Sequence, residues 1–167
     1  MGRDKSTMLV DGVPMAARVA AALAAGGCVH VVAIGGDRAA LGLTVVPDLH
    51  PGEGPLGGII TALRQLPDEV EAMFVASCDL PALTGAAVHA VLEALLDHPT
   101  ADVAIAVGHR DQPLCSAWRP TALPTLEHLF HTGERRATAA VEALTVERVP
   151  VAAQVLVNVN TIADLHE

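Results

Sequence analysis

The 167-residue sequence predicts a single α/β domain, residues 1–167, in which helices cover both faces of a mainly parallel, Rossmann-like sheet. Short apolar runs alternate with longer stretches of helical periodicity, which is typical of βαβ units in a three-layer fold. Hydrophobic residues make up 51% of the chain and charged residues 17%, enough apolar material for a core. No internal repeat, low-complexity tract or linker predicts a second domain.

The individual elements follow from apolar patterns bounded by Gly and Pro. Pro14 suits the first turn of a helix, which Gly26 and Gly27 would end near Ala25. Strands are predicted over residues 28–34, 43–46, 74–79, 101–107 and 146–151, and helices over 14–25, 55–66, 85–98, 123–131 and 135–144. The run from Pro113 to Trp118 is expected to be a short antiparallel element at the sheet edge.

Charge and cysteine usage exclude several classes of partner. The formal net charge of −9 repels a polyanion, so neither a nucleic acid nor an acidic membrane surface is expected as a partner. The three cysteines are widely spaced and form no CxxC pair, so neither a disulfide framework nor a structural zinc site is indicated.

No signal-peptide pattern opens the chain and no 18-residue uncharged apolar stretch occurs. A soluble, cytoplasmic protein is the expectation.

Asp79 is the first candidate for a catalytic role. It follows the apolar run that begins at Phe74, and Pro81 comes two positions later. Ligands of open α/β sheets bind beyond the carboxyl ends of the strands, where a carboxylate can hold a hard cation such as Mg²⁺. An Asp in this position is also a common turn former or helix cap, and the pattern alone leaves that alternative open.

Three loops are expected to converge on one crevice. They are the basic start of the chain, the end of the strand at Asp79 and the loop at residues 47–58, which contains Asp48 and is rich in Gly and Pro. The last of these ends at a helix N-terminus, whose free N–H groups and dipole attract anions. Carboxylate, cation and glycine together are what a nucleotide with a divalent cation requires.

The same segments resemble a known family along nearly the whole chain. Met1-Gly2-Arg3-Asp4-Lys5 looks like the end of the signature loop of the MobA-like molybdenum cofactor guanylyltransferases, within the NTP-transferase superfamily. Further matching motifs are Val46-Pro47-Asp48, Gly54-Pro55-Leu56-Gly57-Gly58, Cys78-Asp79-Leu80-Pro81, Gly133-Glu134-Arg135-Arg136 and Asn158-Val159-Asn160-Thr161. The resemblance implies the fold of the nucleotide-diphospho-sugar transferases.

The resemblance also implies substrates and residue roles. The reaction would be Mg²⁺-dependent transfer of GMP from GTP to molybdopterin or its metal-loaded form, releasing pyrophosphate. Other cofactor-maturation proteins or a molybdoenzyme are the further partners that it suggests. Lys5 and Asp79 would be catalytic, and Asp79 would also bind the metal. The nucleotide would be bound by Gly2, Lys5, Asp37, Asp48, Gly54 and Asp79. The acceptor would be bound by Arg135 or Arg136 together with Asn158 and Asn160.

The chain departs from the family pattern in two places. In the family, a first strand and most of the glycine-rich loop precede Met-Gly-x-Asp-Lys, so the sheet of this chain would lack a central strand. Asp37 stands before Arg38 where the family usually has Asn. Three alternatives stay open: a transferase that uses CTP with the same cofactor, a sugar-phosphate nucleotidyltransferase, and a nucleotide-binding homologue without catalysis.

Simpler interpretations of several site candidates also stay open. Lys5 lies near a terminus, where a lysine is commonly solvated, and Arg135 and Arg136 could belong to a solvated face. Asn158 and Asn160 could satisfy nearby backbone groups.

Overall fold

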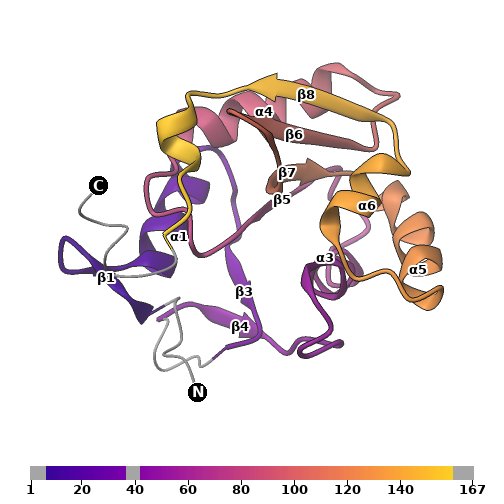
Figure 1. Ribbon diagram of the computed structural model, residues 1–167, viewed down its shortest axis with the longest axis horizontal. Helices are drawn as coiled ribbons and strands as arrows, with labels where there is room; N and C mark the ends of the chain where they lie inside the picture. Colours follow the sequence, from indigo (N-terminus) through magenta and orange to yellow (C-terminus); the bar gives the residue numbers. More distant parts are fainter. Residues whose placement is uncertain (1–6, 37–41, 160–167) are drawn as a thin grey trace.

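A four-stranded sheet forms the centre of the computed structural model, which describes residues 7–36 and 42–159 (Figure 1). Its order is β5-β7-β6-β8. The strands span Met73–Ala76 (β5), Asp111–Trp118 (β7), Val103–Val107 (β6) and Val146–Pro150 (β8). β6 and β8 pair in parallel, whereas β7 is antiparallel to both β5 and β6. β5, β6 and β8 therefore run in the same direction, and the predicted mainly parallel sheet is confirmed.

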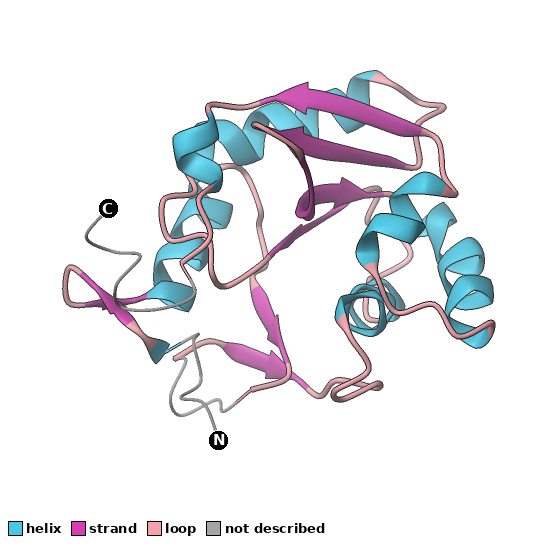
Figure 2. Cartoon of the chain, viewed as in Figure 1, coloured by secondary structure: helices cyan, strands magenta, loops and turns pink. Residues whose placement is uncertain are grey.

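Helices cover both faces of this sheet and produce three layers (Figure 2). The helices span Met15–Ala25 (α1), Pro55–Arg64 (α3), Gly85–Asp97 (α4), Leu123–His131 (α5) and Ala137–Glu142 (α6). Two further short segments, Pro120–Ala122 and Ala153–Leu156, are 3₁₀ turns. β6 is apolar on both faces because it is covered on both sides. Ala104 and Ala106 face α1 and α4, and Val103 and Ile105 face α3, α5 and α6.

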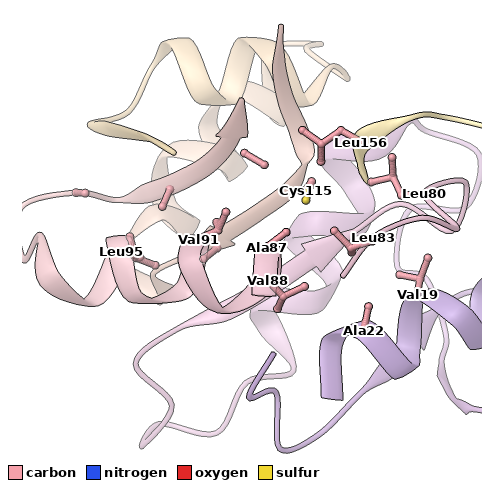
Figure 3. Packing of buried hydrophobic residues seen from close by; sticks show 14 residues of the cluster. Val19, Ala22, Leu80, Leu83, Ala87, Val88, Val91, Leu95, Cys115 and Leu156 are labelled. Carbon is pink, nitrogen blue, oxygen red and sulfur yellow. The ribbon is translucent and has the colours of Figure 1, made fainter. Parts of the chain in front are cut away.

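The core under α1 and α4 is built from small side chains (Figure 3). Val88, Val91 and Leu95 of α4 are fully buried there. A Cβ atom added to Gly26 would lie 2.5 Å from Val88, so the end of α1 reaches α4 only because this residue is glycine. Small residues at the crossing therefore let the two helices pack closely together over the sheet.

A second, separate sheet contains two parallel strands, β3 (Val32–Ile34) and β4 (Thr44–Val46). A hairpin, β1 (Leu9–Val10) and β2 (Val13–Pro14), precedes α1. Its two turn residues, Asp11 and Gly12, both have positive φ, at 51° and 78°. Positive φ at both central positions matches the twist of a tight hairpin, and Asp and Gly are residues that adopt it. The sequence indicated this turn but not the strands on either side of it.

Three predictions about the elements need correction. β7 is antiparallel as expected, but it lies inside the four-stranded sheet and not at its edge. The strand predicted over residues 28–34 spans only Val32–Ile34. In the described part of the chain it pairs only with β4, and that pairing begins at Val32. Val29, which precedes the paired residues, is 88% exposed. The helix predicted over residues 135–144 spans Ala137–Glu142, since Glu134 holds the two preceding backbone amides outside the helix.

A large cavity separates the two sheets. It has a volume of about 990 Å³, and residues of β3 and β5 line it together with apolar residues of α1 and α3. Within the described residues, β3 pairs only with β4, and β5 pairs only with β7. The sheet is thus interrupted between β3 and β5, where the resemblance implied that a strand would be lacking. No helix in the described ranges is long and apolar enough to span a membrane.

Filling this cavity from a helix should stabilise the protein. Ala62 of α3 lines the cavity, so Ala62→Leu adds apolar volume where there is room for it. We expect the free energy of unfolding in urea to rise by about 0.5–2 kcal/mol. Ala104→Leu is the matched control, because Ala104 is fully buried in the packed core of β6 and the same change should cost about 1–3 kcal/mol there. Equal destabilisation by both changes would show that the cavity is not open.

Candidate active site

The backbone holds Asp79 at the carboxyl end of β5 from two directions. The β5–β7 ladder continues past the strand, because the Ser77 amide donates to the Leu114 carbonyl at 2.9 Å. The Asp79 carbonyl accepts from the Val159 amide, also at 2.9 Å. Its side-chain Oδ1 is buried and has no hydrogen-bond partner among the described residues. A buried carboxylate oxygen without a donor is costly, and such an atom requires an explanation such as a bound ion.

The residues around Asp79 fit one kind of metal site. In the described part of the chain, no group of three or more His, Cys, Asp or Glu side chains forms a protein cage. Mg²⁺ does not need one, since it is usually bound by one or two carboxylates together with substrate phosphates and water. The free oxygen of Asp79 matches that donor set.

The turn that follows β3 lines the same cavity as Asp79. Gly35, Gly36, Ser77 and Asp79 all line the cavity. The Gly35 amide donates to the Val46 carbonyl at 2.8 Å, and its φ of 69° turns the chain away from the strand. The loop after β3 and the segment after β5 therefore border the same cavity. Because glycine has no side chain, Gly35 and Gly36 leave space for a ligand to approach the backbone closely.

Asp48 organises the loop that precedes α3. Its Oδ1 accepts from the His50 amide and from the Thr61 hydroxyl, both at 2.9 Å. The Thr61 hydroxyl also accepts from the Leu49 amide at 3.1 Å, and Thr61 is fully buried. This cluster fixes the start of the loop against α3. The predicted contact of Asp48 with a nucleotide is not tested by these bonds, and they do not involve its second oxygen.

Arg135 anchors the other end of that loop. Its guanidinium pairs with Glu53 at 2.8 Å, donates to the Phe130 carbonyl at 2.7 Å and lies 3.9 Å from the centre of the Phe130 ring. Its carbonyl accepts from the Leu56 amide at 3.2 Å. A Cβ atom at Gly54 would lie only 2.9 Å from this carbonyl oxygen, so the close approach requires glycine. Most donors of Arg135 are therefore committed to the protein.

Arg136 instead lines a second hollow of about 360 Å³, which Ser77 and Asn158 also line. Glu134 holds its guanidinium at 2.7 and 3.0 Å and also accepts from the Arg135 and Arg136 amides. The hydrogen bonds from Arg136 lower the pKa of Glu134 from 4.5 to about 2. Of the two arginines in the predicted acceptor site, the structure places only Arg136 beside Asn158.

Some site candidates cannot be placed, and others had not been predicted. Gly2, Lys5, Asp37 and Asn160 lie outside the described residues. Neither Thr61 nor Arg110 was among the predicted site residues: a threonine inside a helix carries no distinctive signal, and Arg110 lies in the short segment between the strand predicted to end at residue 107 and the run that begins at Pro113. The motif His-Arg-Asp-Gln at residues 109–112 was the signal that could have identified Arg110, because it follows the carboxyl end of β6.

Residues 1–149 match the family model of the MobA-like NTP transferase domain. The chain belongs to this family. Membership makes it a nucleotidyltransferase and confirms the resemblance found in its sequence motifs. The fold agrees, because β5, β6 and β8 carry the candidate site at their shared carboxyl edge between two layers of helices.

Individual members support the same placement. The chain is 35% identical to the probable molybdenum cofactor guanylyltransferase of Deinococcus radiodurans over 168 residues, covering 99% of this chain and 86% of that protein. It is 37% identical over 144 residues to the molybdenum cofactor guanylyltransferase of Rhodobacter capsulatus, covering 81% and 70%. Molybdopterin-guanine dinucleotide biosynthesis protein A of Archaeoglobus fulgidus shares the fold, with a TM-score of 0.74, 23% identity and coverage of 99% and 88%.

Removing the Thr61 hydroxyl should loosen the loop before α3. Thr61→Val keeps the side-chain shape but leaves the Leu49 amide and Asp48 Oδ1 without this partner, so we expect a loss of about 1–3 kcal/mol in unfolding free energy. Hydrogen exchange of the amides at residues 48–50 should accelerate as well. Thr61→Ser keeps the hydroxyl and is the control. If the serine variant loses as much stability as the valine variant, the hydroxyl does not fix the loop.

Glu134 should make the free energy of unfolding depend on pH in the acidic range. Because folding lowers its pKa from 4.5 to about 2, its contribution is fully present above pH 4.5 and is lost as the pH falls toward 2. Glu134→Gln should therefore show a shallower fall in unfolding free energy across that range than the wild-type chain. Glu69→Gln, at an exposed position, is the control for removing one carboxylate. Parallel pH profiles for the wild-type and Glu134→Gln chains would contradict the assignment.

Proposed function

We propose that this MobA-like nucleotidyltransferase transfers GMP from GTP to the terminal phosphate of molybdopterin or its metal-loaded form. The observation that carries the proposal is the carboxylate oxygen of Asp79, which is buried, has no hydrogen-bond partner among the described residues and belongs to a residue that lines the large cavity. The names of the two relatives with 35% and 37% identity support the choice of GTP and of the molybdenum cofactor. We place the activity in the cytoplasm, a reducing compartment that suits cysteines spaced as widely in sequence as Cys28, Cys78 and Cys115.

The chain's residues supply alignment and charge. Asp79 would hold Mg²⁺, which neutralises charge on the reacting phosphates when it is bound. Gly35 and Gly36 leave room for the nucleotide beside Asp79, and Asp48 with Gly54 would contact its guanosine part across the loop before α3. The resemblance assigns the phosphates to Gly2 and Lys5 and leaves Asp37 as a neighbour of the nucleotide.

The acceptor would lie on the opposite side of β5, toward Arg136, Asn158 and Asn160. The structure supports the first two of these assignments by the hollow that Arg136 and Asn158 share. Because Arg135 is committed to Glu53 and Phe130, we assign it to holding the loop, and Arg136 to the acceptor.

The proposed reaction needs no strong base. An oxygen of the acceptor phosphate, already ionised near neutral pH, forms a bond to the α-phosphorus of GTP. The bond from that phosphorus to the bridging oxygen breaks, and pyrophosphate leaves with the electron pair. Catalysis then rests on holding the two phosphates in line and on compensating the charge that develops between them.

The direct test is pyrophosphate release by the chain with Mg²⁺ and molybdopterin, using GTP and CTP in parallel reactions. Release with GTP and not with CTP is the expected result. Preference for CTP would assign the chain to cytidylyl transfer, and silence with both nucleotides under conditions where each binds would leave a nucleotide-binding protein without catalysis.

Asp79→Asn should abolish most of the activity while preserving the fold. The substitution keeps the size of the side chain and removes the charge that would hold the metal, so we expect at least a 100-fold lower kcat, on the order of the loss for one electrostatic catalytic group. Circular dichroism should be unchanged. Asp68→Asn, at an exposed position, is the control and should retain full turnover. Near-normal turnover by the Asp79 variant would remove Asp79 from the catalytic site.

A further inference from the structure

Arg110 is the unpaired charge in the hollow beside β5. Three charged residues line this hollow. Asp111 pairs with Arg148 at 3.0 Å, and Arg136 pairs with Glu134 at 2.7 Å. Among the described residues, Arg110 has no ion pair. The hollow therefore carries an uncompensated positive charge in a chain whose formal net charge is −9.

The backbone gives Arg110 a defined position. It lies in the turn between β6 and β7, where its carbonyl accepts from the Gly108 amide at 3.2 Å. The turn is tied to β8 by Arg148, whose guanidinium reaches the neighbouring Asp111. Since Arg148 neutralises Asp111, the carboxylate next to Arg110 does not cancel the charge of Arg110. The side chain is exposed and free to meet a ligand from solvent.

The hollow and the large cavity are two spaces that meet at the end of β5. Ser77 and Pro55 line both of them, whereas Asp79, Gly35 and Gly36 line only the cavity and Arg110, Arg136 and Asn158 line only the hollow. A reaction between two phosphorylated substrates needs two such spaces that share a boundary, with the reacting atoms at the boundary.

We infer that Arg110 binds the phosphate monoester of the acceptor and positions it for reaction from the hollow side of β5. This assignment rests on the proposed function for the identity of the second substrate, and it adds a residue that neither the motifs nor the family resemblance indicated. A guanidinium can hold two phosphate oxygens at once, which fixes the direction of the group as well as its location. Ser77, Thr138 and Asn158 offer neutral hydrogen-bonding groups around the same space.

Two measurements test the role of Arg110. The first is calorimetric binding of molybdopterin to the full chain without nucleotide, and the second is pyrophosphate release at varied GTP and varied acceptor. Arg110→Ala should weaken acceptor binding and raise the acceptor KM by about 10- to 100-fold, the range expected for losing a hydrogen bond to a charged group. The KM for GTP should stay within twofold of the wild-type value. Arg110→Lys should recover part of the loss, because it keeps the charge without the planar fork.

Arg64→Ala is the matched control, since Arg64 forms an exposed ion pair with Glu127 and lines neither space. It should leave both KM values unchanged. Wild-type acceptor affinity in Arg110→Ala would overturn the inference, as would a rise in the KM for GTP in place of the acceptor KM. The binding experiment separates this inference from the proposed function: a wild-type chain that binds the acceptor through Arg110 but releases no pyrophosphate would contradict only the function.

Discussion

The pairing of β5 with β7 positions Asp79 relative to the turn that carries Arg110. β5 has only this neighbour in the described sheet, and the ladder from Met73 and Trp118 to Ala76 and Cys115 fixes its register. Trp118 is fully buried and donates to the Ser116 hydroxyl at 2.7 Å, which ties the end of β7 into the core. Because β7 begins at the turn that carries Arg110, one strand positions both the carboxylate of Asp79 and the cation on the other side of β5.

The candidate site also depends on how charges are shared among its arginines. Arg135 and Arg136 are adjacent in sequence, yet one closes a loop and the other lines a hollow. The difference comes from their acidic partners: Glu53 reaches Arg135 across the loop, whereas Glu134 holds Arg136 near its own backbone. A sequence pattern that contains two arginines does not reveal this division, because Glu53 lies 82 positions away from Arg135.

The elements with strong local signals could be predicted from the sequence, and those defined by distant partners could not. The helices α3, α4 and α5 begin where Pro55, Gly85 and Leu123 suggested, since their apolar spacing and flanking residues are local. The interior position of β7 was missed because strand order depends on pairing between residues far apart in the chain. Asp79 could be selected as a candidate from its place after an apolar run, and its role in the site stays a prediction. The role of Thr61 could not be predicted, because it arises from hydrogen bonds with Leu49 and Asp48, which lie 12 and 13 positions away.

The interruption between β3 and β5 has a consequence for the cooperativity of unfolding. Backbone ladders connect β5, β6, β7 and β8 into one unit, whereas within residues 7–36 and 42–159 β3 and β4 pair only with each other. Local opening free energies vary across a protein according to the contacts and bonds that an opening breaks. Opening the two-stranded sheet leaves the ladder of the larger sheet intact. Gly35 and Gly36 therefore belong to the region whose opening breaks fewer backbone ladders, so the β3 side of the candidate site can open while the β5–β7 pairing that leads to Asp79 stays in place.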